Sequence, residues 1–261
     1  MPVKPSDFPY ATALKPRKRA LIIGASSGMG AALAKKLARE GYDLALVARR
    51  EKLLSALCDE INQNNKVRAR YYVHNVSDYS IVSDLLRRII SELGGLDLVI
   101  YAAGVNFAPH LNEYNTEYDR QMIEINLIGA FAWLNPIAAL FQSAKAGQIV
   151  GISSVAGERG RIGNPGYNAS KAGLTSYLES LRNRLTRHSV NVLTVKAGFV
   201  QTDMLKAAQK VMFPITAEKA ADDIWKAIRA RKQEIYTPWF WRWIMFIIRN
   251  IPSMLFRRMS F

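Results

Sequence analysis

The sequence is poor in the residues that build disulfide bonds and metal sites. It contains one cysteine, Cys58, and three histidines among 261 residues. One cysteine excludes an intramolecular disulfide bond, so a reducing compartment is the simpler interpretation. We expect Cys58 to pack inside a helix, with a reactive thiol as the alternative. His74, His110 and His188 lack the spacing of metal ligands, so we predict no metal site.

The chain also lacks internal repeats, low-complexity segments and an apolar run near its start. Three prolines precede position 10, and a basic cluster follows at 15–19. This beginning predicts no cleaved secretory signal and a cytoplasmic protein. The ten prolines and 16 glycines fit ordinary turns. A hydrophobic content of 49% supports one large α/β domain built around a single sheet.

Acidic residues are scarce at both ends of the chain. The formal net charge is +15, of which residues 1–20 hold +4 and residues 229–261 hold +6. The long middle therefore carries only +5. Uniform basicity would indicate nucleic acid as a partner, whereas basic ends on an ordinary core favour an anionic surface. The alternative is that both ends are solvated tails.

Short apolar runs alternate with helical patterns along the chain. Six runs are expected to be strands, at residues 19–23, 43–48, 67–73, 96–102, 148–153 and 191–196. Helices are expected over residues 31–38, 50–64, 78–93, 115–143 and 167–187. This alternation predicts an α/β fold, a Rossmann-type doubly wound parallel sheet flanked by helices, with ligands at its carboxyl edge. We place a basic arm at 1–18, one catalytic domain at 19–237 and an amphipathic extension at 238–261.

A glycine-rich turn follows the first expected strand. Its residues are Gly24, Ala25, Ser26, Ser27, Gly28, Met29 and Gly30. In a strand, glycine turn and helix, the backbone N–H groups at the helix N-terminus can hold a pyrophosphate. The spacing is G-x-x-x-G-x-G and not the general G-x-G-x-x-G, and a tight turn without a ligand is the alternative. We predict that this turn binds a dinucleotide.

An arginine stands where a dinucleotide site selects its cofactor. Arg49 follows the second expected strand, 19 residues after Gly30. An acidic residue near this position would bind the adenosine ribose of NAD, whereas a guanidinium pairs with a 2′-phosphate. The alternative is an arginine that ends a strand in solvent. The sequence therefore favours NADP(H) over NAD(H).

Tyr167 and Lys171 are four residues apart in an expected helix, so their side chains share one face. An ammonium beside a phenol favours the phenolate, which predicts that Lys171 lowers the pKa of Tyr167. Such a tyrosine exchanges protons nearer neutrality than a free one, whose pKa is about 10. Ser154 follows the fifth expected strand and can donate a hydrogen bond to the same carbonyl oxygen. Ser154 falls at the carboxyl edge of the expected sheet, together with the glycine turn, Arg49, Gly104 and Gly198.

Five motifs stand in a fixed order along the chain. They are GASSGMG at 24–30, NLIG from Asn126, ISSVAG at 152–157, YNASK at 167–171 and VKAGFVQT at 195–202. In this order and spacing the chain resembles a short-chain dehydrogenase/reductase of the compact type over roughly residues 18–237. The resemblance implies that Tyr167 is the general acid/base and that Ser154 polarises the reacting carbonyl. It also implies that Lys171 bonds the nicotinamide ribose, that Asn126 holds a water in the proton relay, and that hydride passes between nicotinamide C4 and the substrate carbon.

The same resemblance extends the expected cofactor site beyond the glycine turn and Arg49. It adds Asn75, Val76, Ala103, Gly104, Tyr167, Lys171, Gly198, Val200 and Thr202. Three positions depart from the family pattern. Tyr101-Ala-Ala-Gly104 replaces Asn-Asn-Ala-Gly, Asn75 replaces an aspartate that contacts adenine, and Ala197-Gly198 replaces Pro-Gly. We expect Tyr101 to point into packing, and since no reacting group is missing, we expect an active enzyme.

The loop after the sixth expected strand is apolar. It contains Phe199, Met204, Leu205, Val211, Met212 and Phe213, with Lys206 and Lys210 between them. One interpretation is a lid over an apolar alcohol or ketone. The other is that these side chains only cover the core.

Residues 239–251, WFWRWIMFIIRNI, exceed what the catalytic fold requires. As a helix this stretch is about 20 Å long, too short for a hydrocarbon core of about 30 Å, and Pro252 interrupts it. Its tryptophans, with Arg242 and Arg249 on one face, fit a helix lying in the membrane interface. We therefore expect peripheral membrane contact through residues 239–258. The alternatives are that the tail packs on a partner subunit or folds back over the substrate pocket.

These features lead to a first hypothesis of an NADP(H)-dependent oxidoreductase that interconverts a ketone and a secondary alcohol on an apolar, lipid-like substrate. Family members commonly form dimers or tetramers, so we expect a homodimer or homotetramer. The second hypothesis is a catalytically silent nucleotide-sensing or membrane-associated scaffold, which the intact Ser154, Tyr167 and Lys171 argue against. The third is a binding module driven by the basic ends, and the ordinary charge of the middle argues against nucleic acid.

Overall fold

The computed structural model describes residues 18–207 and 211–259, without the side chains of residues 206 and 207. The basic arm expected at 1–18 therefore lies outside the described residues except for Lys18. Lys210 of the apolar loop lies outside them as well.

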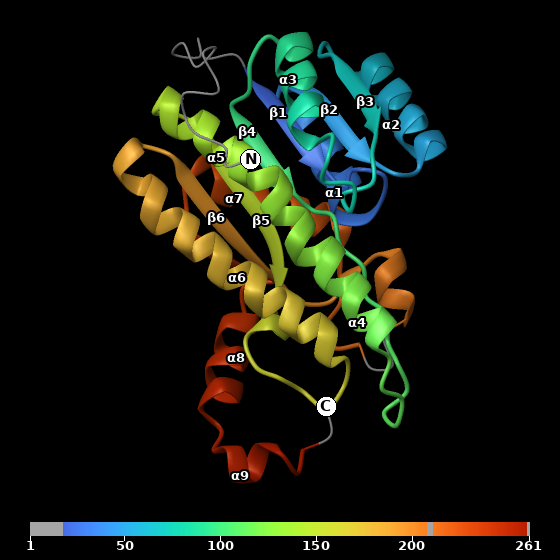
Figure 1. The fold of residues 1–261 in the computed structure, drawn as a ribbon, viewed down its shortest axis with the longest axis vertical. Coiled ribbons are helices and arrows are strands. Elements are labelled where there is room, and N and C mark those ends of the chain that lie inside the picture. Colours follow the sequence, from blue (N-terminus) through green and yellow to red (C-terminus); the bar gives the residue numbers. More distant parts are fainter. Residues whose placement is uncertain (1–17, 208–210, 260–261) are drawn as a thin grey trace.

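One sheet of seven parallel strands forms the centre of the fold (Figure 1). The strands are β1 (Arg19–Ile23), β2 (Asp43–Ala48), β3 (Ala69–Val73), β4 (Leu98–Tyr101), β5 (Gln148–Ser154), β6 (Asn191–Ala197) and β9 (Glu234–Thr237). Their order is β3-β2-β1-β4-β5-β6-β9, so the sheet grows outward in both directions from β1. That is the doubly wound Rossmann arrangement, and it confirms the predicted fold class.

Helices cover both faces of this sheet. On one face lie α1 (Gly28–Arg39), α2 (Glu51–Asn64) and α7 (Ala217–Arg229). On the other lie α3 (Val82–Leu93), α5 (Gly129–Ala144) and α6 (Pro165–Leu185), with α4 (Thr116–Ile123) packed against α6. Two further helices, α8 (Trp241–Asn250) and α9 (Ser253–Phe256), extend beyond the carboxyl ends of β5 and β6 (Figure 1).

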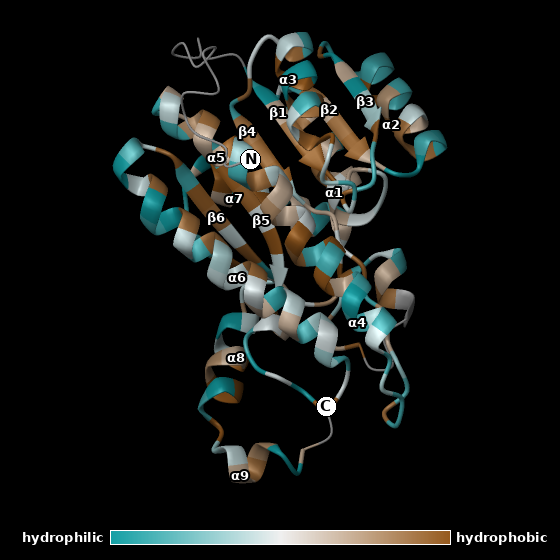
Figure 2. Ribbon diagram, in the orientation of Figure 1, coloured by the Kyte–Doolittle hydropathy of each residue, from teal (hydrophilic) through white to brown (hydrophobic). Residues whose placement is uncertain are grey.

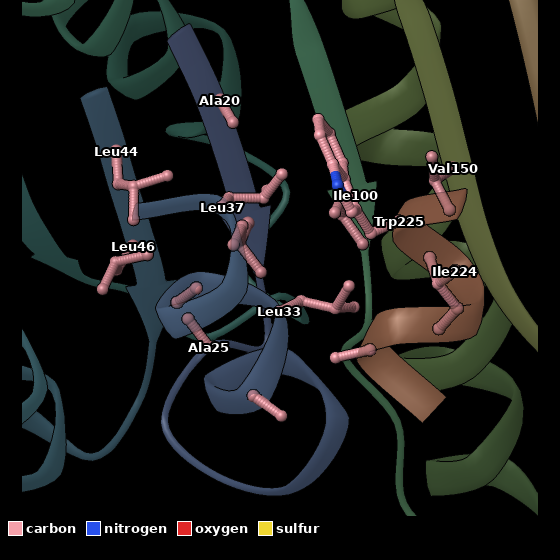
Figure 3. Close-up of a cluster of buried hydrophobic side chains, with 14 of the residues drawn as sticks. Ala20, Ala25, Leu33, Leu37, Leu44, Leu46, Ile100, Val150, Ile224 and Trp225 are labelled. Carbon is pink, nitrogen blue, oxygen red and sulfur yellow. The ribbon is translucent and has the colours of Figure 1, made fainter. Parts of the chain in front are cut away.

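The core fills both spaces between the sheet and its helices. Every residue of β1 and β4 is buried, since helices cover both faces of the sheet. This burial explains why the sequences of such strands are nearly continuous apolar runs. Figure 2 shows these strands as the hydrophobic centre of the molecule and the helices as polar on their outer sides. In one space Leu33 and Leu37 of α1 pack with Ile224 and Trp225 of α7 (Figure 3). Cys58 lies in the same cluster, and burial raises its pKa to about 12, which agrees with a packing role.

The helical run Thr116–Ala144 is long and apolar enough to cross a membrane by length and composition, and 61% of its most apolar window is buried inside the protein. It comprises α4, a π-helical segment at Glu124–Ile128 and α5. From α5, Trp133 and Phe141 are fully buried in the core. The apolar character of the run is therefore explained by packing within this fold.

Three strands and the helices α7 and α9 lie outside the predicted set. β9 adds a seventh strand beside β6, and β7 (Val200–Gln201) pairs with β8 (Ile215–Thr216) in the loop region before α7. β9 is four residues long and mostly polar or half-buried, so it lacks the apolar run that marks the other strands. Tyr101 is fully buried and its hydroxyl donates to the Ile125 carbonyl at 2.6 Å, as expected from its packing role.

Candidate active site

The carboxyl ends of neighbouring strands bring the expected site residues to one rim. The turn after β1 touches the turn after β4, because a Cβ at Gly24 would lie 2.4 Å from the Ala103 nitrogen. Gly24 also has a φ of +92°, so glycine is required there both for conformation and for space. On the next strands along, Ser154 of β5 pairs in register with Ala197 of β6. The rim therefore places the glycine turn, Ala103, Ser154 and the residues after β6 side by side.

The N-terminus of α6 fixes the position of Tyr167. Asn164 caps the helix in the left-handed region, at a φ of 56°, and its side-chain oxygen accepts from the Tyr167 N–H at 3.3 Å. Pro165 at the first helical position favours a helix start here. The amide of Asn164 donates to the Phe107 carbonyl at 2.7 Å. The cap thereby ties the tyrosine's helix to the loop after β4.

Ser154 is near enough to Tyr167 for its hydroxyl to lower the pKa of the phenol. Its own Oγ accepts from the Ala156 N–H at 3.1 Å and donates to the Ala197 carbonyl at 3.2 Å, so the side chain is held on both sides. The next residue back, Ser153, bonds the Lys171 carbonyl at 3.1 Å and joins β5 to α6. The hydroxyls of Ser154 and Tyr167 are thus placed where both could bind the same substrate oxygen.

Lys171 is almost fully buried beside Tyr167. Its Nζ donates to the Ile152 carbonyl at 2.9 Å and lies 5.7 Å from the centre of the tyrosine ring. Burial lowers the pKa of Lys171 to about 8. The pKa of Tyr167 is raised by burial, which outweighs the opposing effects of the Ser154 hydrogen bond and the Arg161 charge. The expected shift of the Tyr167 pKa toward neutrality is therefore not found in the protein without cofactor: the shift is upward because burial penalises the charged form, and Lys171 is not among its causes.

Asn126 braces the rim from within the π-helical segment. Its Nδ2 donates to the Val105 carbonyl at 3.0 Å and to the Ser170 hydroxyl at 2.9 Å, and its Oδ1 accepts from the Val105 N–H at 2.7 Å. Single π turns inside α-helices are often found at functional sites. Because both amide N–H groups are occupied, the side chain can offer a water only its remaining oxygen lone pair. The implied role in a proton relay stays a prediction.

The glycine turn has the shape and donors that a dinucleotide pyrophosphate needs. A Cβ at Gly30 would lie 2.1 Å from the Gly24 carbonyl, and one at Gly28 would lie 2.9 Å from the Thr202 side chain. α1 starts at Gly28, and within the described residues the Ser27 side chain caps none of its N–H groups. These N–H groups can therefore bind anionic oxygens. The residues present fit a nicotinamide dinucleotide.

Arg50 reaches the glycine turn, and sequence reasoning missed it. Its guanidinium donates to the Ser26 hydroxyl at 2.9 and 3.1 Å and also to the Ser27 hydroxyl. Arg49 is exposed, and among the described residues no hydrogen bond joins it to the turn. The sequence shows the two arginines side by side, and this doublet could have indicated Arg50. The spacing from Gly30 pointed only to Arg49, although adjacent side chains point in different directions.

The other expected cofactor residues are spread around the same rim. Asn75 is exposed and its side-chain oxygen accepts from the Ser77 N–H at 3.3 Å, whereas Val76 is buried. A cavity of about 660 Å³ lies between α1 and the loop after β7. Gly28, Ala31, Lys35, Thr202, Leu205 and Val211 are among its lining residues. The cavity therefore adjoins the glycine turn and not the tyrosine.

Comparison with known families decides what kind of protein carries this rim. The sequence model of the family described as short chain dehydrogenase matches residues 18–212. The chain is a short-chain dehydrogenase. This match confirms the resemblance that the motifs indicated. Enzymes of this family use nicotinamide cofactors and act on CH–OH and C=O groups.

Individual relatives agree with this assignment. An uncharacterized oxidoreductase of Mycobacterium tuberculosis is 31% identical over 248 residues, which cover 94% of this chain and 98% of that protein. The 3-oxoacyl-[acyl-carrier-protein] reductase of Escherichia coli is 32% identical over 190 residues, covering 73% and 76%. The structure of a short-chain dehydrogenase from Sphingobium yanoikuyae in complex with NADPH has a TM-score of 0.78 at 23% identity, covering 90% and 97%. The last likeness supports the fold alone.

The C-terminal extension of this short-chain dehydrogenase packs one helical face beside the rim. Trp241 and Met245 of α8 are buried with Val155, which follows Ser154. The ring centre of Trp241 lies 5.7 Å from that of Phe199, and a Cβ at Gly198 would lie 2.2 Å from the Trp241 Nε1. Gly198, expected to contact cofactor, thus also makes room for this indole. Of the possibilities considered for the tail, folding back toward the substrate pocket is the one that fits this inner face of α8.

The same extension holds the segment that joins Ser154 to Tyr167 in the dehydrogenase. Glu158 is buried and accepts from Lys196 and Tyr236, each at 2.6 Å, and its carboxylate lies 3.6 Å from Arg249 of α8. Arg159 donates to the carbonyls of Ile248 and Arg249, and its guanidinium lies 3.8 Å from the centre of the Phe256 ring. Sequence reasoning missed the contacts of Glu158 and Arg159 with the extension, because they join residues about 90 positions apart.

Proposed function

We propose that the protein is an NADP(H)-dependent oxidoreductase that interconverts a ketone and a secondary alcohol on an apolar substrate. The observation that carries the proposal is the grouping of Ser154, Tyr167 and Lys171: the Ser154 hydroxyl acts on the pKa of the phenol, and the Lys171 Nζ lies 5.7 Å from the centre of its ring. They lie on the rim that also presents the glycine turn. A carbonyl oxygen bound between the two hydroxyls would receive one hydrogen bond from each, the Ser154 hydroxyl hydrogen turning to it from the Ala197 carbonyl.

In the reductive direction Tyr167 gives its proton to the oxygen of the reduced carbonyl. The bound nicotinamide supplies the hydride that completes the alcohol. Because burial raises the pKa of Tyr167, the phenol is protonated at neutral pH and ready to donate. Lys171, with a pKa of about 8, can hold or release a proton close to neutrality and lies beside the phenol. Ser154 holds the carbonyl in place.

Two arginines support the choice of NADP(H). Arg49 and Arg50 end β2 at the position where the adenosine ribose is expected, and Arg50 already bonds Ser26 and Ser27. A guanidinium binds a phosphate in a bidentate manner, and NAD has no 2′-phosphate on its adenosine ribose. The NADPH complex of the Sphingobium yanoikuyae dehydrogenase, which has the same fold, is consistent with this choice.

Steady-state kinetics test the proposed reaction and the cofactor together. We expect the protein to oxidise NADPH in the presence of methyl ketones, with kcat/KM rising as the alkyl chain lengthens, because each buried CH₂ contributes about 0.8 kcal/mol. NADPH should be preferred over NADH by about 10- to 100-fold, the worth of a charged hydrogen bond. Arg50→Ala and Arg49→Asp should each lower this preference by raising the KM for NADPH.

Arg68→Ala serves as the control, since this arginine of the neighbouring strand pairs with Asp43 and lies away from the glycine turn. It should leave the preference unchanged. No NADPH oxidation with any ketone would refute the proposed reaction. An unchanged preference in both Arg49 and Arg50 variants would remove these residues from the cofactor site and leave the reaction itself standing.

Apolar side chains near the rim support an apolar substrate. Phe199 packs on Trp241, and Phe213 packs edge-on to Phe240 with ring centres 5.7 Å apart. Val211 and Met212 of the same loop are exposed. The Escherichia coli relative is named for reduction of a 3-oxoacyl group, a ketone on a hydrocarbon chain. Part of the loop therefore covers the core, and its exposed part is free to act as the expected lid.

The outer face of the C-terminal extension supports peripheral binding to an anionic membrane. Trp243, Phe246 and Ile247 of α8 are each more than half exposed, as are Met254 and Leu255 of α9. Arginines accompany them on the same extension, at positions 242, 249, 257 and 258. α8 has ten residues, about 15 Å, which is too short to span a bilayer but long enough to lie in its interface. Exposed apolar side chains accompanied by arginines fit the surface of an anionic membrane better than an uncharged surface of a partner subunit.

Vesicle co-sedimentation tests this contact. We expect the protein to pellet with vesicles that contain about 30% phosphatidylglycerol and to dissociate partly at high salt, because the arginines contribute about 1 kcal/mol each. The triple variant Trp243→Ser, Phe246→Ser, Ile247→Ser should stay in the supernatant. Leu53→Ser, on an exposed position of α2, is the control and should pellet like the wild type.

Wild-type protein that stays in the supernatant would contradict membrane binding. A triple variant that changes from an oligomer to a monomer in size-exclusion chromatography would assign the same face to a partner subunit. Enzymes of this family are often oligomers, and we propose a homodimer or homotetramer for this one.

A further inference from the structure

We propose that Arg161 binds an anionic group of the substrate, a carboxylate or a phosphate ester, next to the carbonyl that Tyr167 protonates. The inference rests on the proposed ketone reduction and adds the charge of the substrate to it. It makes the substrate an amphiphile, with an anionic group near the reacting carbon and an apolar remainder.

Arg161 has a buried donor without an acceptor. Its Nε is fully buried, and no hydrogen-bond partner for that atom exists in residues 18–207 and 211–259. Arginines are rarely buried without a partner, because removing a donor of a charged group from water is costly unless it is hydrogen-bonded. The structure therefore holds a guanidinium whose acceptor is expected to come from a bound molecule.

The position of Arg161 points to the substrate as that molecule. It lies in the segment that joins Ser154 to Tyr167, and Tyr167 is the charged or titratable group that acts on its guanidinium. The interaction is mutual, since the guanidinium favours the phenolate of Tyr167. The dinucleotide phosphates are expected elsewhere, at the glycine turn with Arg50. The electrostatic interaction with Tyr167 thus associates Arg161 with the reacting end of the site, away from the turn expected to hold the cofactor's phosphates.

Other buried cations nearby have partners within the protein. Lys196 pairs with Glu158 at 2.6 Å and with Glu234 at 2.8 Å. Arg159, two residues before Arg161, donates to two backbone carbonyls of α8. Glu158, the carboxylate of this segment, accepts from Lys196 and Tyr236 through Oε1, and its Oε2 is buried without forming a bond to Arg161 or to any other described residue. Of these three basic residues, only Arg161 has a buried donor without an acceptor in the described part of the chain, where the indole N–H of Trp241 also lacks one.

Guanidinium chemistry defines the ligand. Its planar fork of N–H donors matches the paired oxygens of a carboxylate or a phosphate. The remainder of such a substrate would meet the partly buried Phe199, which packs on the buried Trp241. A keto acid or keto phosphate ester with a hydrocarbon chain would bind the guanidinium through its anionic group and the apolar side chains through its chain.

Matched ketone pairs test the inference. The probes are 4-oxodecanoate with its methyl ester, and (2-oxoheptyl)phosphonate with its dimethyl ester. We expect kcat/KM for at least one anion to exceed that of its neutral ester by about 10-fold or more. Arg161→Gln should bring this ratio close to 1, mainly by raising KM for the anion, and Arg161→Lys should restore part of it. The ratio cancels any effect of the lost charge on the pKa of Tyr167, since both members of a pair use the same phenol.

The variant Arg187→Gln is the charge-matched control, because Arg187 is exposed beyond the far end of α6. It should leave the ratio unchanged. The two pairs separate the sources of the anion: preference for the carboxylate alone indicates a keto acid, and preference for the phosphonate alone indicates a phosphate ester. Equal kcat/KM within both pairs, or a ratio that Arg161→Gln leaves intact, would overturn the inference.

A binding measurement separates this inference from the proposed reaction. We expect decanoate to raise the Tm of the wild type, methyl decanoate to raise it less, and Arg161→Gln to lose the difference. If no ketone is reduced but this difference is found, the proposed reaction fails and the anion site stands. If ketones are reduced and neither the Tm difference nor the kinetic ratio depends on Arg161, the reaction stands and the anion site fails.

Discussion

Replacement of Tyr167 by phenylalanine is expected to lower kcat for ketone reduction by about 10²- to 10⁴-fold, the range for loss of a general acid. The phenol is the proton donor in the proposed reaction, and phenylalanine keeps the ring while removing the hydroxyl. The Asn164 cap bonds the backbone N–H of residue 167, so the start of α6 should be unchanged. We therefore expect the same Tm within a few degrees and the same NADPH affinity.

The control for this variant lies on the same helix. Tyr177 donates to the Asn135 side chain at 2.9 Å, so Tyr177→Phe also removes one hydrogen-bonded hydroxyl from α6. It should change kcat less than about 2-fold, as expected for a structural hydroxyl worth about 1 kcal/mol of stability. Single-turnover oxidation of bound NADPH measures the chemical step in both variants. A Tyr167→Phe enzyme that retains a tenth of wild-type kcat would assign the proton to another donor.

The pH dependence of the wild type follows from the raised pKa of Tyr167. Reduction needs the protonated phenol, so its rate should stay constant through neutral pH and fall only in alkaline solution. Alcohol oxidation needs the phenolate, and its rate should rise across the same alkaline range. If bound cofactor brings the pKa down, both limbs shift together to lower pH. Tyr167→Phe should abolish both limbs.

Much of the fold and the reacting residues could be predicted from local patterns. A strand buried on both faces requires a continuous apolar run, and β1, β2 and β4 all have one. Tyr167 and Lys171 could be paired because helical spacing fixes which side chains share a face. The glycine turn could be placed because a φ of +92° at Gly24 needs glycine.

The remaining features depend on contacts that local patterns do not contain. The pKa shifts of Tyr167 and Lys171 follow from burial, which is set by the whole fold, so proximity alone gave the wrong direction for the tyrosine. Arg50 was passed over for Arg49 because adjacent residues point differently once β2 has ended. The buried Glu158 could not be linked to Arg249, since nothing in the sequence shows that α8 returns to this segment.

Lys171→Met is expected to have opposite effects on activity and stability. In the proposed site Lys171 is the cation next to the reacting phenol, so its loss should lower kcat by about 10²-fold or more. Yet burial lowers the pKa of this amine to about 8, so below that pH the folded protein carries a buried ammonium at a cost. Linkage puts that cost at about 3 kcal/mol, and the Ile152 carbonyl loses a hydrogen bond worth about 1 kcal/mol. We therefore expect a net gain of about 1 to 2 kcal/mol in the free energy of unfolding at pH 7.

The sign of this effect can be checked by its pH dependence. Between the folded pKa of about 8 and the unfolded value of about 10.5, the unfolded chain binds the proton and the folded protein does not. The free energy of unfolding of the wild type therefore increases as the pH rises through this range. The stability gain of Lys171→Met over the wild type should shrink from pH 7 to pH 9.5. Urea unfolding at both pH values measures it, with Lys66→Met, at an exposed lysine, as the control that shows no such gain. A variant less stable than wild type at pH 7 would mean that the hydrogen bond to Ile152 outweighs the desolvation of the amine, and that Lys171 is a structural support as much as a catalytic one.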